Sequence, residues 1–322
     1  MSTFSGIQVG LRALETQRKS LDVTGHNIAN SNNEDYNKQR AVHSATYPYT
    51  KPGMNTGFSS GQMGTGVEVK QIERVKDQFV SGQIFKENQS SAFYKEMSQG
   101  LEKIEYILNE PSDSGISSSI NEFWNSLQDL SNNPNDSAAR NMVRENAKTM
   151  IDSFQTVDSQ LKDYQSSIND NLENTVDKIN NTSEKIADLN EEIISVNSTG
   201  QNPNDLLDQR DALFKELNQL INVQSREDEQ GNLIVTTDGR QIINGDDSYK
   251  LEAVPGAGEN ADKIIHSRTG DEITPKNGKT AAMMQLRDEK LTFYRDKLEK
   301  LAEGITSEFN TRHSSGYDIE GV

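Results

Sequence analysis

Hydrogen-bonding and apolar side chains are mixed within the segment LDVTGHNIAN, residues 21–30 of the sequence. Leu21 and Ile28 supply apolar surface, and the hydrogen-bonding groups belong to Thr24, His26, Asn27 and Asn30. A histidine beside amide and hydroxyl groups has the donors and acceptors that both catalysis and polar packing use. The segment is therefore compatible with a buried core, a catalytic cluster or an assembly surface.

Residue types elsewhere in the chain argue against catalysis and against a metal or cofactor site. No two of the four histidines share an i, i+4 spacing or an HExxH context. Cysteine is absent, which excludes disulfides, thiolate zinc sites and a cysteine nucleophile. No GxSxG elbow or phosphate-binding loop occurs, and neighbouring carboxylates such as Glu191 and Glu192 are expected by chance among 50 acidic residues. We predict that the chain is not an enzyme and binds no cofactor.

The composition narrows the kinds of partner. The 322 residues include 50 acidic and 33 basic side chains, a net charge of −17. This balance argues against binding nucleic acid or an anionic membrane surface, both of which attract Lys and Arg. Apolar residues make up only 32% of the chain, and no stretch approaches the ~20 apolar residues of a membrane span. A low apolar content favours an elongated protein with a high ratio of surface to core.

The first 30 residues carry an apolar ladder with the spacing of a coiled coil. Steps of three and four residues connect Phe4 with five residues that we predict to form a seam: Ile7, Leu11, Leu14, Leu21 and Ile28. Arg18 and Gly25 occupy two further positions of the same ladder. Such a helix is marginal alone, so we expect it to need a partner and to fray without one. The alternative is an ordinary amphipathic helix packed on its own domain.

The pattern of the whole chain predicts a mainly α protein: an elongated bundle of long helices with a small antiparallel β insert and an N-terminal coiled-coil-type helix. Residues 36–47 and 67–75 have short strand-like patterns that flank a glycine-rich loop at 48–66. We predict five segments: an N-terminal helix at 1–32, an irregular or β linker at 33–75, a long-helix domain at 76–221, a β insert at 222–279 and a returning helix at 280–322.

Local patterns add detail to this division. Apolar residues at steps of three and four persist from Val143 to Val196, which fits either one rod over 138–198 or a hairpin with its corner at 169–175. Asp238-Gly239 predicts a two-residue hairpin turn. Local ion pairs on the predicted helix at 206–221 and its start are expected among Asp205, Asp208, Arg210 and Asp211. Trp124 is predicted to pack in the core with its apolar neighbours.

Several of these stretches resemble bacterial flagellar axial proteins, the rod, hook and hook-associated proteins. The resemblance begins with GLRALETQRKSLDVTGHNIANSNNEDYNKQR (10–40). Within that group, the match narrows to the hook-associated proteins of the hook–filament junction, through GTGVEVKQIERVKDQF (64–79), FWNSLQDLSNNPNDSAARNMVRENAKTM (123–150), NPNDLLDQRDALFKELNQL (202–220) and residues 285–321. At Asp35 the chain departs from the glycine that the family usually has in the turn after the first helix.

The resemblance implies a structural subunit that self-assembles at the distal end of the hook. Its implied partners are copies of itself, the hook protein, the second junction protein and a flagellar export chaperone that binds a C-terminal part. It also implies an extracellular location, reached by the flagellar type III route without a cleavable signal peptide. Members of the family continue past residue 322 with a β-rich domain and a helix that pairs with the first one, so the chain is expected to be an N-terminal portion.

The same resemblance gives an expected role to the opening segment. Its apolar residues would face a partner helix, and Thr24, His26, Asn27 and Asn30 would contact other subunits or close the helix end. The alternative function is a coiled-coil scaffold or secreted effector with an axial-protein-like start, which would dimerise through the apolar ladder at 143–196.

Overall fold

The computed structural model describes residues 4–48, 64–110, 112, 115–256 and 262–316, and the chain divides into two compact units. The first unit comprises Met1–Asn88, Asn180–Asn218 and Val223–Tyr249. The second comprises Gln89–Ile179, Gln219–Asn222 and Lys250–Val322. Both units are built mainly from long helices, with two small antiparallel sheets in the first unit and one in the second, so the predicted fold class is confirmed. Among the described residues, no helix has the length and apolar character needed to cross a bilayer.

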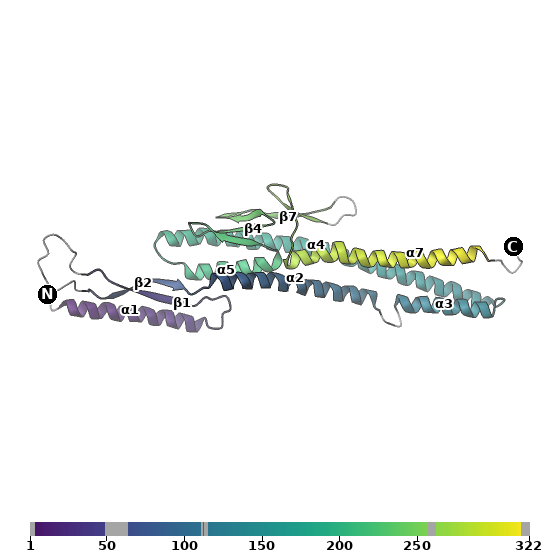
Figure 1. Cartoon of the computed structure of the whole chain (residues 1–322), viewed down its shortest axis with the longest axis horizontal. Helices are drawn as coiled ribbons and strands as arrows, with labels where there is room; N and C mark the ends of the chain where they lie inside the picture. Colours follow the sequence, from purple (N-terminus) through teal and green to yellow (C-terminus); the bar gives the residue numbers. More distant parts are fainter. Residues whose placement is uncertain (1–3, 49–63, 111, 113–114, 257–261, 317–322) are drawn as a thin grey trace. The chain divides into compact units, whose positions relative to one another are not determined.

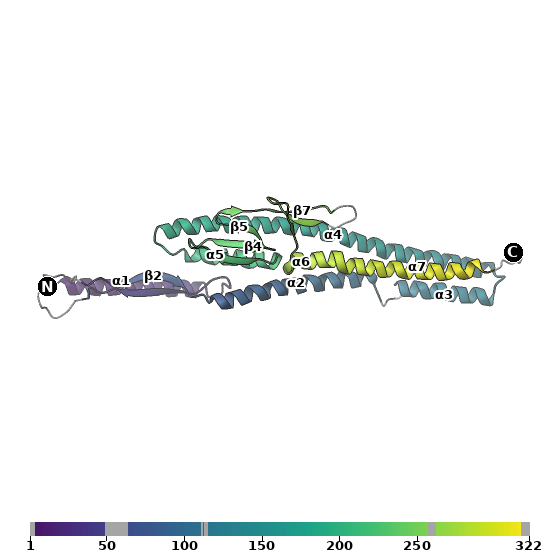
Figure 2. The same ribbon diagram turned by 45° about the horizontal axis from the view of Figure 1, so that its top comes forward.

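The first unit begins with a helix that lies along a two-stranded sheet (Figures 1 and 2). The helix α1 spans Phe4–Ala29, and the strands are β1 (Gln39–Ala45) and β2 (Val67–Arg74). The strands pair antiparallel from Gln39↔Arg74 to Ala45↔Val67, with a register shift between Val42 and His43. Both strands fall in the stretches predicted to be extended. Most of the predicted glycine-rich loop at 48–66 lies outside the described residues.

The long helices follow the predicted apolar periodicity. They are α2 (Gln78–Leu108), α3 (Ile116–Asn132), α4 (Ser137–Ser198) and α5 (Asn204–Leu220). The 62 residues of α4 form one uninterrupted helix, so no corner occurs at 169–175. Its buried side chains recur at helical spacing and include Leu161, Ile168, Leu172, Ile179, Ile186 and Ile193. The apolar ladder of α4 therefore packs against other parts of the same chain.

Two separate sheets occupy the range 222–279, where we predicted one insert. The first, in order β3-β4-β5-β6, comprises Gln224–Glu227, Leu233–Thr237, Arg240–Asn244 and Asp247–Ser248. The second, in order β7-β8-β9, comprises Leu251–Val254, Lys263–His266 and Glu272–Ile273. The sheets belong to different units because the division falls after Tyr249. The predicted turn between β4 and β5 is present, with positive φ at Asp238 (45°) and Gly239 (75°), as a type I′ turn requires.

The last helical stretch has a change of winding within it. It consists of α6 (Gly278–Gln285), a π-helical turn η1 (Leu286–Leu291) and α7 (Thr292–Ser314). Leu286 and Leu291 are buried, so the extra residue of the π turn keeps the apolar face of the stretch pointed at the core. In α3, Phe123 is buried, but its neighbour Trp124 is 48% exposed. The prediction that Trp124 packs in the core is therefore wrong.

Candidate assembly surface

The large apolar side chains of α1 form an exposed stripe. The stripe contains all five predicted seam residues, whose exposed fractions range from 56% at Leu11 to 70% at Leu14: Ile7, Leu11, Leu14, Leu21 and Ile28. Phe4, on the same ladder, is also exposed. An exposed apolar surface that continues along a whole helix is uncommon on an isolated soluble protein and marks a surface that binds something. We call these five residues the α1 stripe.

The opposite face of α1 packs on the β1–β2 hairpin. Thr16 and Val23 are buried there, and Thr16 Oγ1 lies 3.0 Å from the carbonyl oxygen of Val67. Arg12 donates to the carbonyl of Thr65 at 3.0 Å. Ser20 and His43 are joined by a 2.8 Å hydrogen bond between Oγ and Nε2. The hairpin therefore takes the small and polar face of α1 and leaves the apolar stripe uncovered.

Sequence reasoning missed this inner face, although a signal for it exists. Its half-buried and buried residues form a second ladder of three- and four-residue steps, about 200° around the helix from the stripe: Ala13, Thr16, Ser20, Val23 and Asn27. Small and hydroxyl side chains allow a strand pair to approach a helix closely. Because the ladder contains few strongly apolar residues, a search for hydrophobic periodicity does not detect it.

Asn27 ties the end of α1 to the start of β1. Its Nδ2 donates to the carbonyl of Gln39 at 2.9 Å, and its Oδ1 accepts from the Gln39 amide at 2.8 Å. The hydroxyl of Tyr36 also donates to Asn27 Oδ1, at 2.8 Å, and lies 3.0 Å from Nδ1 of His26. The rings of His26 and Tyr36 meet edge to face with their centroids 5.3 Å apart. These bonds fix the connection between helix and strand.

The other two polar candidates bond within α1. Thr24 donates to the carbonyl of Ser20 at 2.9 Å, and Asn30 donates to the carbonyl of His26 at 3.0 Å. Asn30 therefore adds a side-chain bond to the His26 carbonyl, which also accepts from the Asn30 main-chain nitrogen at 3.1 Å. All four polar candidates thus make bonds inside the chain, and a role for them between subunits stays a prediction.

A row of carboxylates on α5 holds the open end of the hairpin. Asp208 accepts from the main-chain and side-chain nitrogens of Asn37 at 3.2 Å and 2.7 Å, and from Arg74 at 2.8 Å. Asp211 accepts from Arg74 at 2.8 Å and from Lys76 at 2.6 Å. One turn earlier on the helix, Asp205 accepts from the side chain of Gln39 at 2.9 Å. We call Asp205, Asp208 and Asp211 the acidic row.

These bonds correct the prediction of local ion pairs on this helix. The acidic row pairs with the hairpin and its flanks, more than 130 residues away in the sequence. Arg210 instead donates to Asn190 Oδ1 on α4 at 3.0 Å, to the Gly231 carbonyl between β3 and β4 at 2.7 Å, and to Glu227 on β3 at 2.5 Å. Spacing along a helix identifies neighbours on its surface but not partners that the fold brings from elsewhere.

The charges around the acidic row shift two pKa values. Burial alone would lower the pKa of Arg74, but its hydrogen bonds and the charges of Asp208 and Asp211 outweigh burial and raise that pKa. Burial, together with the negative charges of Asp205 and Asp208, raises the pKa of Tyr36. Both shifts keep the side chains in the forms that make the observed bonds, a guanidinium cation and a neutral phenol.

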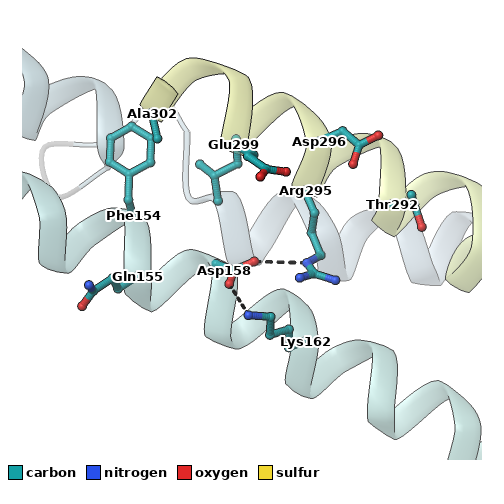
Figure 3. A pocket seen from close by; sticks show the side chains of 10 residues that line it. Phe154, Gln155, Asp158, Lys162, Thr292, Arg295, Asp296, Glu299 and Ala302 are labelled. Atoms are coloured by element: carbon teal, nitrogen blue, oxygen red, sulfur yellow. Dashed lines mark hydrogen bonds and ion pairs between the residues drawn. The ribbon is translucent and has the colours of Figure 1, made fainter. Parts of the chain in front are cut away.

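One pocket on the described surface is lined by side chains that form ion pairs with one another. A pocket of about 440 Å³ between α4 and α7 contains Asp158, which bonds Lys162 at 2.6 Å and Arg295 at 3.1 Å (Figure 3). Asp158 is thus shared between two cations from two helices. No group of His, Asp and Glu residues among those the structure describes is arranged to hold a metal ion. The exposed α1 stripe is the candidate functional surface of the described residues.

Comparison with known proteins decides the family. A sequence model of the flagellar hook-associated protein FlgK helical domain matches residues 101–322. The chain belongs to the FlgK family. The flagellar hook-associated protein 1 of Bacillus subtilis is 36% identical over 243 residues, which cover 75% of this chain and 48% of that protein. The protein of the same name from Salmonella typhimurium is 29% identical over 326 residues, which cover 98% of this chain and 57% of that protein.

The fold agrees with a solved member of the FlgK family. The structure of the flagellar hook junction protein FlgK from Burkholderia pseudomallei superimposes with a TM-score of 0.66 at 26% sequence identity. The match covers 76% of this chain and 45% of that one. The chain thus spans about half the length of the relatives it matches.

Proposed function

We propose that the chain acts as a structural subunit of the bacterial flagellum, at the junction between hook and filament. Membership of the FlgK family supports this location. The observation that carries the mechanism is the α1 stripe, an apolar face interrupted at Arg18 and Gly25 that the described part of the chain leaves exposed. Burying such a face against another helix is how axial subunits could associate without catalysis. We propose no enzymatic role.

The partners that we propose are flagellar components. They are copies of the same subunit, the hook protein, the second junction protein and an export chaperone. The protein would function outside the cell after export through the flagellar route without a cleavable signal peptide. The α1 stripe would meet helices of these axial partners, with Arg18 as a cation within the apolar seam that favours an acidic residue opposite.

The alternative of a coiled-coil scaffold loses its main support in this fold. It required the apolar ladder at 143–196 to be free for dimerisation. In α4 the side chains of that ladder, such as Leu161, Leu172 and Ile186, are fully buried within the chain. A dimer through these residues would first have to unpack the helices around them.

Immunogold electron microscopy of hooks and filaments from the source bacterium tests the location. An antibody against residues 76–313 should label a band where hook meets filament. Label along the whole hook, rod or filament would assign the chain to another axial subunit, and its absence from the appendage would favour the scaffold.

The same assay tests the mechanism with a matched pair of variants. The stripe variant Leu14→Ala with Leu21→Ala should lose the band, because it removes apolar area from the exposed face. The control Gln17→Ala with Asp22→Ala changes two exposed side chains off the stripe and should retain the band. Persistence of the band in the stripe variant would refute assembly through this face.

A further inference from the structure

We propose that the acidic row of α5 is a positioning element that fixes the direction of the N-terminal arm, defined as α1 with the β1–β2 hairpin (residues 4–48 and 64–74). This inference rests on the proposed function, since it assigns the direction in which the α1 stripe is presented to partners. Three features support it: the place where the hairpin is held, the polarity of the contact, and the length of the connection to the rest of the chain.

The acidic row binds both strands at the same end of the hairpin. Gln39 and Arg74 are cross-strand partners and form the outermost pair of the ladder. Asp205 binds the side chain of Gln39, and Asp208 binds Arg74. These two carboxylates stand one turn apart on a single helix, so they bind the two strands at once. Holding two adjacent strands at two points resists rotation as well as separation.

The contact between arm and α5 is polar and largely shielded from water. The side chains of Arg74, Asp208 and Asp211 are exposed by 13%, 9% and 18%. Ion pairs with so little exposure are screened by salt much less than surface pairs. Main-chain contacts add to them, because Asn202 and Asn204 each donate to the carbonyl of Ile72 at 3.0 Å. Hydrogen bonds are directional, so a contact made of them specifies an angle better than an apolar contact does.

A short connection of three residues joins the arm to α2, and by itself it does not fix the direction of the arm. From the end of β2 the chain reaches α2 through residues 75–77 only. Lys76, in the middle of this connection, bonds Asp211 at 2.6 Å, so the acidic row also holds the pivot. If these bonds were removed, the bonds of Asn202 and Asn204 to the Ile72 carbonyl and the ion pair of Asp35 with Lys215 would be left, and we expect the arm to vary in direction about residues 75–77. The apolar face of α5, which includes Phe214 and Leu217, would stay packed because the acidic row does not contribute to it.

A distance measurement between two spin labels tests this proposal on the chain itself. The sequence has no cysteine, so the replacements Gln17→Cys and Ser195→Cys would create unique labelling sites at exposed positions on α1 and α4, within one unit. Double electron–electron resonance should give a single narrow distance peak. Asp208→Asn with Asp211→Asn should replace that peak by a broad distribution, with the helix content by circular dichroism unchanged.

Two further variants make the result specific. Arg74→Gln cuts the same ion pairs from the side of the arm and should broaden the distribution in the same way. Glu191→Gln with Glu192→Gln removes two negative charges from exposed positions on α4 and should leave the peak narrow. The proposal is overturned if the unmodified chain already gives a broad distribution, or if neutralising the acidic row leaves the peak narrow.

The assembly assay separates this proposal from the proposed function. The stripe variant Leu14→Ala with Leu21→Ala should keep the narrow distance peak but lose the junction band. The acidic-row variant should lose both. A junction band that persists in the stripe variant refutes assembly through α1, whereas the distance measurement alone decides whether the acidic row fixes the arm. A normal band in an acidic-row variant with a broad distance distribution refutes the positioning role and leaves the proposed function intact.

Discussion

The side chain of Asn27 closes a ring of two hydrogen bonds with the main chain of Gln39, at 2.9 Å and 2.8 Å. We predict that Asn27→Ala exposes the Gln39 amide to exchange, because both main-chain groups lose their partner. An unsatisfied buried group costs about 1–3 kcal/mol, and the free energy of local opening should fall by about that much. Hydrogen exchange at the Gln39 amide measures it.

Asn27→Asp is the informative companion of that variant. The carboxylate can still accept from the Gln39 amide and from Tyr36, but it cannot donate to the Gln39 carbonyl. The exchange rate of the Gln39 amide in Asn27→Asp should therefore lie between the rates in the unmodified chain and in Asn27→Ala. Asn141→Ala, at an exposed position on α4, should leave exchange at Gln39 unchanged. Equal protection in all three variants would show that the ring does not hold the start of β1.

Two glycines on α2 should respond to alanine with opposite signs. A Cβ added at Gly100 would stand 2.2 Å from Cδ1 of Leu286, whose side chain is buried. Overpacking of this kind costs about 1–3 kcal/mol. A Cβ at Gly82 meets nothing within 4 Å, so Gly82→Ala should stabilise the helix by about 0.5–1 kcal/mol. Thermal unfolding of both variants compares them, and a stabilising Gly100→Ala would contradict the close packing of α2 on Leu286.

Arg210 should not tolerate lysine although the charge is kept. Its fully buried guanidinium divides its donors among Asn190, Gly231 and Glu227. A lysine ammonium has no planar fork to reach all three, so at least one buried acceptor would lose its partner, at a cost of about 1–3 kcal/mol. Arg226→Lys, on exposed strand β3, is the control and should change stability by less than about 0.5 kcal/mol. Urea unfolding of the two variants should differ accordingly.

Much of the fold could be predicted because it depends on periodicity. Patterns within a few residues of one another predict helix α5, the turn at Asp238-Gly239 and the two strands of the β1–β2 hairpin. The stripe of α1 was predicted for the same reason, since large apolar side chains at steps of three and four mark one face of a helix. Local patterns also predicted that residues 138–198 are helical, although they did not decide between one rod and a hairpin of two helices.

The parts that sequence reasoning missed depend on residues far apart in the chain. Nothing in the sequence connects Arg74 with Asp208, which are 134 positions apart, or Asn27 with a role in binding β1. Trp124 was misplaced because helical spacing assigns a residue to a face but does not say how far that face is covered. Asp35 forms an ion pair with Lys215 at 2.9 Å that no local pattern predicts.

The ion pairs of Asp158 predict a stability that falls in acid. Burial alone would raise the pKa of Asp158, but its bonds to Lys162 and Arg295 outweigh burial and hold that pKa below its ordinary value. A carboxyl whose pKa is lower in the folded state stabilises the fold above the unfolded pKa. That stabilisation should be lost as the pH falls through the lowered folded value. Denaturant unfolding along a series of acidic pH values measures the loss.

Asparagine at the same position should remove this pH dependence. Asp158→Asn keeps the shape of the side chain but has no proton to gain, so its unfolding free energy should change less with acid than that of the unmodified chain. Asp163→Asn, at an exposed position on the same helix, should keep the full acid response. If Asp158→Asn and Asp163→Asn lost stability in parallel as the pH fell, the acid sensitivity would arise elsewhere.

The α1 stripe should matter for assembly and not for the stability of the chain itself. Leu14 and Leu21 are about 70% exposed, so alanine at either position should change the unfolding free energy by less than about 0.5 kcal/mol. Val23, two residues after Leu21, is buried on the hairpin, and Val23→Ala should cost about 1.5–3 kcal/mol at most. Hydrogen exchange across residues 11–28 measures both effects. Leucine variants that destabilise α1 as much as Val23→Ala would mean that the stripe is already covered within the chain, and α1 would then have no free face to offer a partner.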